Sequence, residues 1–155
     1  MVKVDIGLTQ KSIVGVSKIL NEILANEYVL YTKTRNFHWN VTGSHFNDYH
    51  KFFESQYEDL NEKIDEIAER VRMLGERPVA SLSEFLKLTI VKDATKAQKS
   101  EDMVKTLLQD HETLIKIIRK SLEKVEKFED NGNEDFLIAL MQDHEKMAWM
   151  LRSMI

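Results

Sequence analysis

The chain has 155 residues, 43% hydrophobic and 31% charged, so it is long and apolar enough to bury a core as one globular domain. The absence of cysteine excludes disulfides, thiolate metal sites and thiol catalysis. The formal net charge of −4 gives no general reason to expect binding to nucleic acid or to an anionic membrane. We therefore expect a single domain over residues 1–155.

The first residues, MVKVDIGLTQK, contain no apolar run of signal-peptide length, and no stretch of the chain reaches the length of a membrane span. Together with the lack of cysteine, which suits a reducing compartment, this predicts a cytoplasmic protein. A single proline, Pro78, and only five glycines favour long uninterrupted helices over a turn-rich β protein.

Apolar residues that recur at three- and four-residue steps predict two long helices in the first half of the chain. The first is expected over residues 10–38, up to the break in the segment NVTGS. Ser44 is the expected N-cap of the second helix, which continues to Leu74 and stops at Gly75. Each of these helices would be roughly 42 to 46 Å long at 1.5 Å per residue.

A longer connection separates this pair from two further helices. The segment LSEFLKLTI is expected to form a short helix inside the connection. The third long helix starts at Ser100 and ends at the segment DNGN, and the fourth runs from about Glu134 to the C-terminus. Two pairs of long helices joined by one crossover that holds a small helix describe an all-α fold, the four-helix bundle of ferritin-like topology.

The second helix carries two pairs of potential metal ligands at a spacing of four residues: His50 with Glu54, and Asp65 with Glu69. This spacing puts both members of a pair on one helix face. Taken alone, each pair is most simply a solvated surface pair. Glu54 and Asp65 are eleven residues apart, close to three turns, so both pairs face the same way but lie roughly 16 Å apart along the axis.

One ion cannot be held by both pairs of the same chain at that separation. Either the pairs are unrelated patches, or an antiparallel partner helix brings Asp65 and Glu69 of one chain opposite His50 of another. A two-fold interface would do this and would create two identical sites. His38, at the end of the first helix, would complete a set of imidazole and carboxylate ligands that suits Fe, Mn or Zn, and the oxidation of Fe²⁺.

Other catalytic signatures fail on inspection of the sequence. No histidine follows a glutamate by three residues, as the dinuclear centre inside a ferritin-type bundle requires. His111 and His144 each precede a glutamate, but the second histidine of a zinc-protease motif is missing in both places. Both lie in apolar stripes, so we expect them to be core residues with satisfied hydrogen bonds. His45 is expected at the surface.

The segments NFHWNVTGSHFNDYHKFFE, DEIAERVRMLGERPVASLSEFL and HEKMAWML together resemble the Dps family of mini-ferritins, over about residues 16–151. The resemblance implies a hollow homododecamer that oxidises Fe²⁺ with hydrogen peroxide or oxygen, stores the Fe³⁺ mineral inside and protects against oxidative stress. It also implies a ferroxidase site between two-fold-related subunits. His38 and His50 would be the ligands from one subunit, and Asp65 and Glu69 would come from the other.

The resemblance also bears on residues around these ligands. Where the common pattern has Asp four residues after the second histidine, this chain has Glu54, whose added methylene keeps the charge but shifts the carboxylate. Trp39 matches a family tryptophan that lies near the site and absorbs oxidising equivalents, and its alternative role is packing at the dimer interface. The three-fold pore assignment falls on Glu126, Asp130 and Asp135, although acidic residues there also suit the dipole at a helix start.

A structural protein of the same fold that binds and compacts DNA is the alternative function. Family members that bind DNA generally use Lys/Arg-rich tails, whereas this N-terminus offers only Lys3 and Lys11, and the chain ends in MLRSMI. Phosphate binding needs clustered cations, and the sequence shows no such cluster. We therefore expect DNA binding to be weak or absent at physiological salt. A third possibility, polar residues that are only interface contacts, is disfavoured by the combined match.

Overall fold

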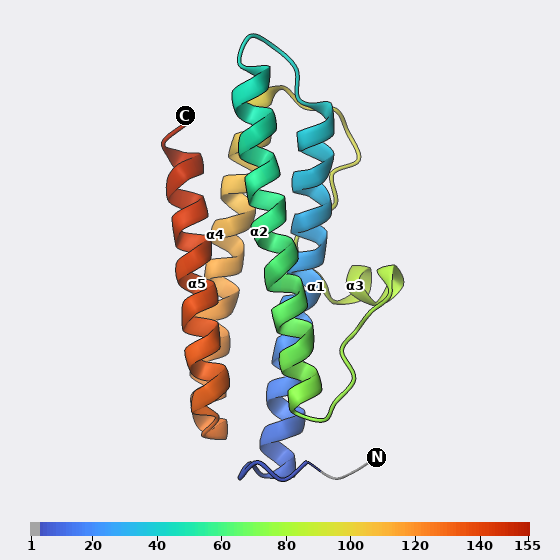
Figure 1. Cartoon of the computed structure of the whole chain (residues 1–155), viewed down its shortest axis with the longest axis vertical. Helices are drawn as coiled ribbons and strands as arrows, with labels where there is room; N and C mark the ends of the chain where they lie inside the picture. Colours follow the sequence, from blue (N-terminus) through green and yellow to red (C-terminus); the bar gives the residue numbers. More distant parts are fainter. Residues whose placement is uncertain (1–3) are drawn as a thin grey trace.

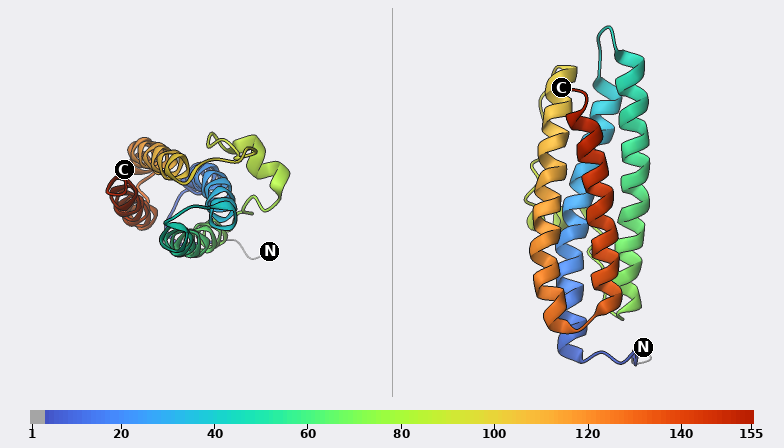
Figure 2. Two further views of the ribbon diagram at one scale, coloured as in Figure 1. Left: turned by 90° about the horizontal axis from the view of Figure 1, so that it is seen from above. Right: turned by 90° about the vertical axis from the view of Figure 1, so that its left-hand side faces the viewer.

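The computed structural model describes residues 4–155, and this part of the chain contains helices and no strand. In chain order the elements are α1 (Gln10–Asn40), α2 (Phe46–Met73), α3 (Leu82–Leu88), α4 (Ser100–Val125), the 3₁₀ turn η1 (Glu126–Phe128) and α5 (Asn131–Arg152). The helices α1 and α2 form one antiparallel hairpin, and α4 and α5 form a second one packed beside it (Figure 1, Figure 2). The predicted all-α, ferritin-like four-helix bundle is confirmed. No helix in the described residues combines the length and the apolar character needed to cross a membrane.

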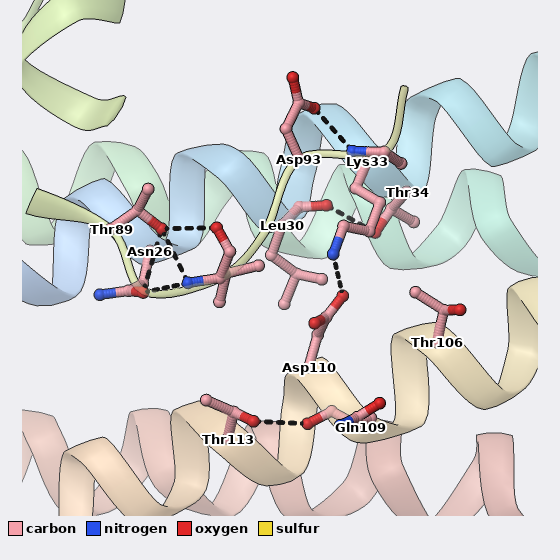
Figure 3. A network of polar contacts seen from close by, with 12 residues as sticks. Asn26, Leu30, Lys33, Thr34, Thr89, Asp93, Thr106, Gln109, Asp110 and Thr113 are labelled. Atoms are coloured by element: carbon pink, nitrogen blue, oxygen red, sulfur yellow. Dashed lines mark hydrogen bonds and ion pairs between the residues drawn. The ribbon is translucent and has the colours of Figure 1, made fainter. Parts of the chain in front are cut away.

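The connection between the hairpins runs along the bundle and carries α3 against the outer side of α1 (Figure 1). Two asparagines of α1 hold this connection in place. Asn21 Oδ1 accepts a hydrogen bond from the Val79 N–H at 2.8 Å. Asn26 Oδ1 accepts hydrogen bonds from the N–H groups of Ile90 and Val91 at 2.9 and 3.1 Å. It also accepts one from the Thr89 hydroxyl at 3.1 Å (Figure 3). The asparagines thereby satisfy backbone groups that have no helix of their own to bond with.

The start of α2 differs from the sequence prediction. The helix begins at Phe46 after His45, rather than after a Ser44 cap, and the His45 side chain makes no capping hydrogen bond. The short crossover helix has the stronger cap. Ser81 and Glu84 form a capping box in which each side chain bonds the other residue's backbone N–H. The sequence therefore predicted the turn between α1 and α2 correctly but placed the N-cap of α2 one residue too early, at Ser44 instead of His45.

The segment DNGN does not separate the last two helices, so that part of the prediction was wrong. The helix α4 ends at Val125, η1 follows, and Glu129 turns the chain with a left-handed φ of 55°. Asp130 then caps α5, because its Oδ1 accepts a hydrogen bond from the Asn133 N–H at 3.0 Å. The first N–H groups of a helix lack partners within it, so this cap lets α5 begin at Asn131, ahead of the predicted start.

Two apolar clusters fill the bundle. One includes Leu20 and Ile67, and the other includes Phe37 and Phe53. Along α1, Glu27 lies where the first cluster gives way to the second, and its side chain is fully buried. A buried carboxylate is unfavourable in an apolar core unless it is paired, so Glu27 needs a polar partner inside the bundle.

Candidate metal centre

The end of α1 and the first turns of α2 hold two histidines face to face. The rings of His38 and His50 stack with centroids 3.8 Å apart and planes inclined by 19°. His38 Nδ1 lies 2.8 Å from the backbone oxygen of His50, and His50 Nδ1 lies 2.8 Å from the backbone oxygen of His38. The structure thus brings together the two histidines that the sequence assigns to one site, across the turn formed by residues 41–45.

The reciprocal hydrogen bonds determine where the ring protons sit. A carbonyl oxygen only accepts, so the Nδ1 of each ring must be the donor. In a neutral ring Nε2 then carries a free lone pair and can bind a metal ion without first losing a proton. The His38 carbonyl is one of the last four of α1, which have no partner within their helix, so His50 also completes the end of α1.

Aromatic rings surround the histidine pair and restrict its movement. His38 is only 7% exposed, and His50 is half-buried. The Phe46 ring stacks on His50 with centroids 4.9 Å apart, and the Tyr57 ring meets His38 edge-on at 5.2 Å. Glu54, one turn along α2 from His50, is half-buried on the same helix face. The structure shows no contact between its carboxylate and either histidine, so its role as a ligand stays a prediction.

Asp65 and Glu69 lie far from the histidine pair. The helix α2 is continuous, so a rise of 1.5 Å per residue puts Asp65 roughly 22 Å from His50 along the axis. Both carboxylate side chains are exposed, and Glu69 lines a groove between α2 and α5. Within residues 4–155 of one chain, no three His, Asp or Glu side chains are grouped so that they could hold a metal ion. One ion cannot contact the histidines and these carboxylates of the same chain.

Known proteins are similar to this chain in sequence and in fold. A ferritin family model, described as a ferritin-like domain, matches residues 17–155. A low temperature-induced protein of Nostoc sp. (strain PCC 7120) is 45% identical over 157 residues, covering 100% of this chain and 88% of that protein. The DNA protection during starvation protein 2 of Bacillus anthracis is 36% identical over 140 residues, covering 90% of this chain and 96% of its own length.

The crystal structure of Dps from Vibrio cholerae O1 covers 99% of this chain and 96% of its own with a TM-score of 0.93 and 34% sequence identity. The chain belongs to the Dps family. The Vibrio protein is described as a member of a broad superfamily of ferritin-like diiron-carboxylate proteins. Dps from Staphylococcus aureus is 37% identical with a TM-score of 0.87, covering 95% of this chain and 97% of that one.

The three acidic residues assigned to a pore of the Dps assembly have different surroundings in this chain. Glu126 is exposed in η1. Asp130 is buried, and both of its carboxylate oxygens accept hydrogen bonds from Asn133, one from the backbone and one from the side chain at 2.6 Å. Asp135 is exposed and lines the same groove as Glu69. Asp130 is therefore occupied as a helix cap, whereas the carboxylates of Glu126 and Asp135 face outwards.

A second polar cluster lies inside the Dps-family bundle. Glu27 Oε1 lies 2.6 Å from His144 Nε2, and His144 Nδ1 lies 2.8 Å from His111 Nδ1. All three residues are fully buried, which confirms that the two histidines are core residues. The expectation that their hydrogen bonds are satisfied was wrong in part, because His111 Nε2 and Glu27 Oε2 have no partner among the described residues. Glu27 was missed, although an acidic residue inside an apolar stripe is itself a signal.

The buried His111 predicts that acid weakens the fold. Burial, and then the neighbouring His144, hold the pKa of His111 well below its ordinary 6.5. Below about pH 6.5, His111 is protonated in the unfolded chain but stays neutral in the folded chain. The free energy of unfolding therefore falls as pH falls below this value, and His111 does not change it at higher pH. Replacing His111 with Gln should remove up to about 1.4 kcal/mol of this loss per pH unit.

Thermal unfolding between about pH 5 and 8 measures this effect. His45→Gln, at an exposed histidine, is the matched control and should keep the native pH dependence. An equally steep acid loss in His111→Gln would mean that another group is responsible.

Proposed function

We propose that this chain is an iron-storing mini-ferritin. It oxidises Fe²⁺ with hydrogen peroxide or oxygen at sites shared by two-fold-related subunits, and it keeps the ferric mineral inside a hollow homododecamer. The observation that carries the proposal is the His38–His50 pair. Its reciprocal hydrogen bonds leave the Nε2 of each neutral ring free, so the chain presents two preformed nitrogen donors to an arriving Fe²⁺ ion.

The carboxylate half of the site comes from the partner subunit in this proposal. Asp65 and Glu69 lie on the same face of α2 as Glu54, yet too far along the helix to meet the histidines of their own chain. A two-fold axis that crosses α2 would bring each carboxylate pair opposite a histidine pair and would build two identical sites. Carboxylates are hard donors and favour the ferric product.

Peroxide and Fe²⁺ are consumed together at such a site. Two Fe²⁺ ions each give one electron to hydrogen peroxide, the O–O bond breaks, and two protons complete two water molecules. Because the peroxide takes both electrons, no hydroxyl radical leaves the site. In this proposal Glu54 is the third donor from the histidine side. Trp39, the exposed chain neighbour of His38, is the candidate from the family resemblance for absorbing an unpaired oxidising equivalent. Glu126 and Asp135 are the residues that could attract iron at a pore.

Anaerobic loading with Fe²⁺ followed by substoichiometric peroxide tests the proposal, with particle size measured in parallel. We expect ferric absorbance to rise faster than in protein-free buffer and the protein to elute as a large assembly. A monomer or dimer that forms no ferric product faster than buffer would refute it.

Two observations favour a second function, DNA binding. Some of the relatives carry the name DNA protection during starvation protein. The structure also gathers lysines that the sequence left scattered, in a groove of about 710 Å³ between the start of α1 and the end of α4. The charged side chains that line it are Lys11, Lys18, Lys124, Lys127, Glu22 and Glu129. Four cations against two anions give this groove a modest attraction for phosphate.

We predict that this attraction is too weak to matter at physiological salt. Iron-free protein should shift plasmid DNA only at low salt, because few phosphate contacts mean little counterion release and the chain carries a formal charge of −4. The double variant Lys124→Gln/Lys127→Gln should lose the low-salt shift, whereas Lys51→Gln, an exposed lysine outside the groove, should keep it. A clear shift at about 150 mM salt would make DNA binding a principal function.

A further inference from the structure

Tyrosine rings form a continuous path that begins at the histidine pair. The Tyr57 ring meets the His38 ring at 5.2 Å, edge-on and inclined by 74°. The Tyr31 ring lies 6.2 Å from Tyr57, again edge-on, and the Tyr28 ring lies 5.9 Å from Tyr31. Tyr28 in turn stacks on Phe85 of α3 at 4.3 Å. Neighbouring rings at such distances are in contact, so an electron can pass from one to the next in short steps.

A guanidinium group sits among the first rings of this path. The guanidinium carbon of Arg35, Cζ, lies 5.5 Å from the centroid of the Tyr57 ring, 5.8 Å from that of Tyr31 and 5.2 Å from that of Trp39. Its Nη1 donates a hydrogen bond to Tyr31 Oη at 2.6 Å. Arg35 thus holds the Tyr31, Tyr57 and Trp39 rings around its guanidinium group.

The rings that could lose an electron near His38 differ in exposure and in chemistry. Trp39 is 65% exposed and lies under the Arg35 cation, which disfavours the positively charged radical that tryptophan first forms. Tyr57 is half-buried and touches the His38 ring. A tyrosine loses its phenolic proton together with the electron, so its radical is neutral and a nearby cation does not penalise it.

Tyrosine can supply a proton as well as an electron. An ordinary phenol is neutral at physiological pH, so a tyrosine in contact with the His38 ring has both to give.

We infer that Tyr57 is a one-electron donor to the iron site, with Tyr31 as the next ring along which the oxidation can move. The inference rests on the proposed function and concerns a site that holds one Fe²⁺ rather than two. There the iron supplies one electron to hydrogen peroxide, and the Tyr57 phenol supplies the second electron and a proton. The O–O bond breaks to give one hydroxide and one water, leaving Fe³⁺ and a neutral Tyr57 radical. Tyr57 thereby replaces the missing second iron and prevents release of a hydroxyl radical.

The test uses the assembled protein loaded anaerobically with one Fe²⁺ per site and mixed with one peroxide per iron. Electron paramagnetic resonance of freeze-quenched samples should show a neutral tyrosyl radical. Tyr57→Phe should lose most of this signal and should release more hydroxyl radical to a spin trap. Tyr49→Phe is the matched control, since Tyr49 is half-buried on the same helix and packs on Phe53 rather than on the histidines. Its radical yield should equal that of the native protein.

Four outcomes would overturn the inference. A tyrosyl signal that survives in Tyr57→Phe would place the donor elsewhere. A signal that comes only from tryptophan and disappears in Trp39→Phe would make Trp39 the donor. Ferric product without any protein radical would show that the iron works alone, while the proposed function stands. If no ferric product forms at all, the proposed function and the inference both fail.

Discussion

Replacement of His50 by Ala is expected to slow Fe²⁺ oxidation by peroxide by about 10- to 100-fold or more. The change removes one nitrogen donor and also removes the contacts that hold the His38 ring in place. The His50 ring stacks on His38, and its Nδ1 bonds the His38 carbonyl. Asp65→Ala should cause a loss of similar size, since its carboxylate is a proposed ligand from the partner subunit. The exposed Asp65 side chain adds little to the stability of its own chain, so this variant should unfold at the native temperature.

Ferric absorbance followed in a stopped-flow instrument measures both rates. Asp59→Ala is the matched control, because Asp59 is also an exposed aspartate of α2 but lies outside the proposed ligand set. It should oxidise iron at the native rate. An Asp65→Ala protein as fast as the Asp59→Ala protein would remove Asp65 from the site.

Loss of the buried ion pair between α1 and α4 should have the largest effect on stability. Lys33 Nζ lies 2.6 Å from Asp110 Oδ2, with the two side chains 3% and 13% exposed (Figure 3). Burial raises the pKa of Asp110 even though Lys33 lowers it, so the carboxylate depends on its partner. Lys33→Met leaves this carboxylate buried and unpaired, which should cost about 3–5 kcal/mol at neutral pH.

Thermal unfolding at a fixed protein concentration checks this prediction. The double variant Lys33→Met/Asp110→Leu removes both charges and should recover most of the loss. Arg152→Met is the control for an exposed pair, because Arg152 bonds Glu112 at 2.8 Å with both side chains partly in water. It should cost less than about 1 kcal/mol. Equal losses for Lys33→Met and Arg152→Met would show that burial of the first pair has no energetic consequence.

The sequence predicted the fold well because the signals that define it are local. Apolar residues at helical spacing gave the four long helices, and the missing periodicity between them gave the crossover with α3. The errors concern the starts of α2 and α5 and the end of α4. Asn-Gly in the segment DNGN is a breaker inside a helix, but in a first turn the Asp130 cap compensates for it. The choice between these outcomes depends on a hydrogen bond that spacing alone does not reveal.

The sequence could predict that His38 and His50 lie together, but not the hydrogen bonds that orient their rings. The spacing of His38 and His50 across a short turn indicated that they face each other, and the structure has them stacked. The exchange of Nδ1 hydrogen bonds with backbone carbonyls depends on ring rotation, so the free Nε2 atoms could not be inferred from the sequence. Side chains that meet across different helices, as Glu27 and His144 do, were likewise out of reach because they are distant in the chain.

The proposal that two subunits share each ferroxidase site is tested most directly by mixing two inactive variants. If His50→Ala and Asp65→Ala subunits are dissociated together and reassembled in equal amounts, a mixed pair combines intact histidines from one chain with intact carboxylates from the other. Random pairing should then restore about one quarter of the sites, with the matching fraction of the native Fe²⁺ oxidation rate. A reassembled mixture no faster than the average of the two variants alone would contradict a site built from two subunits.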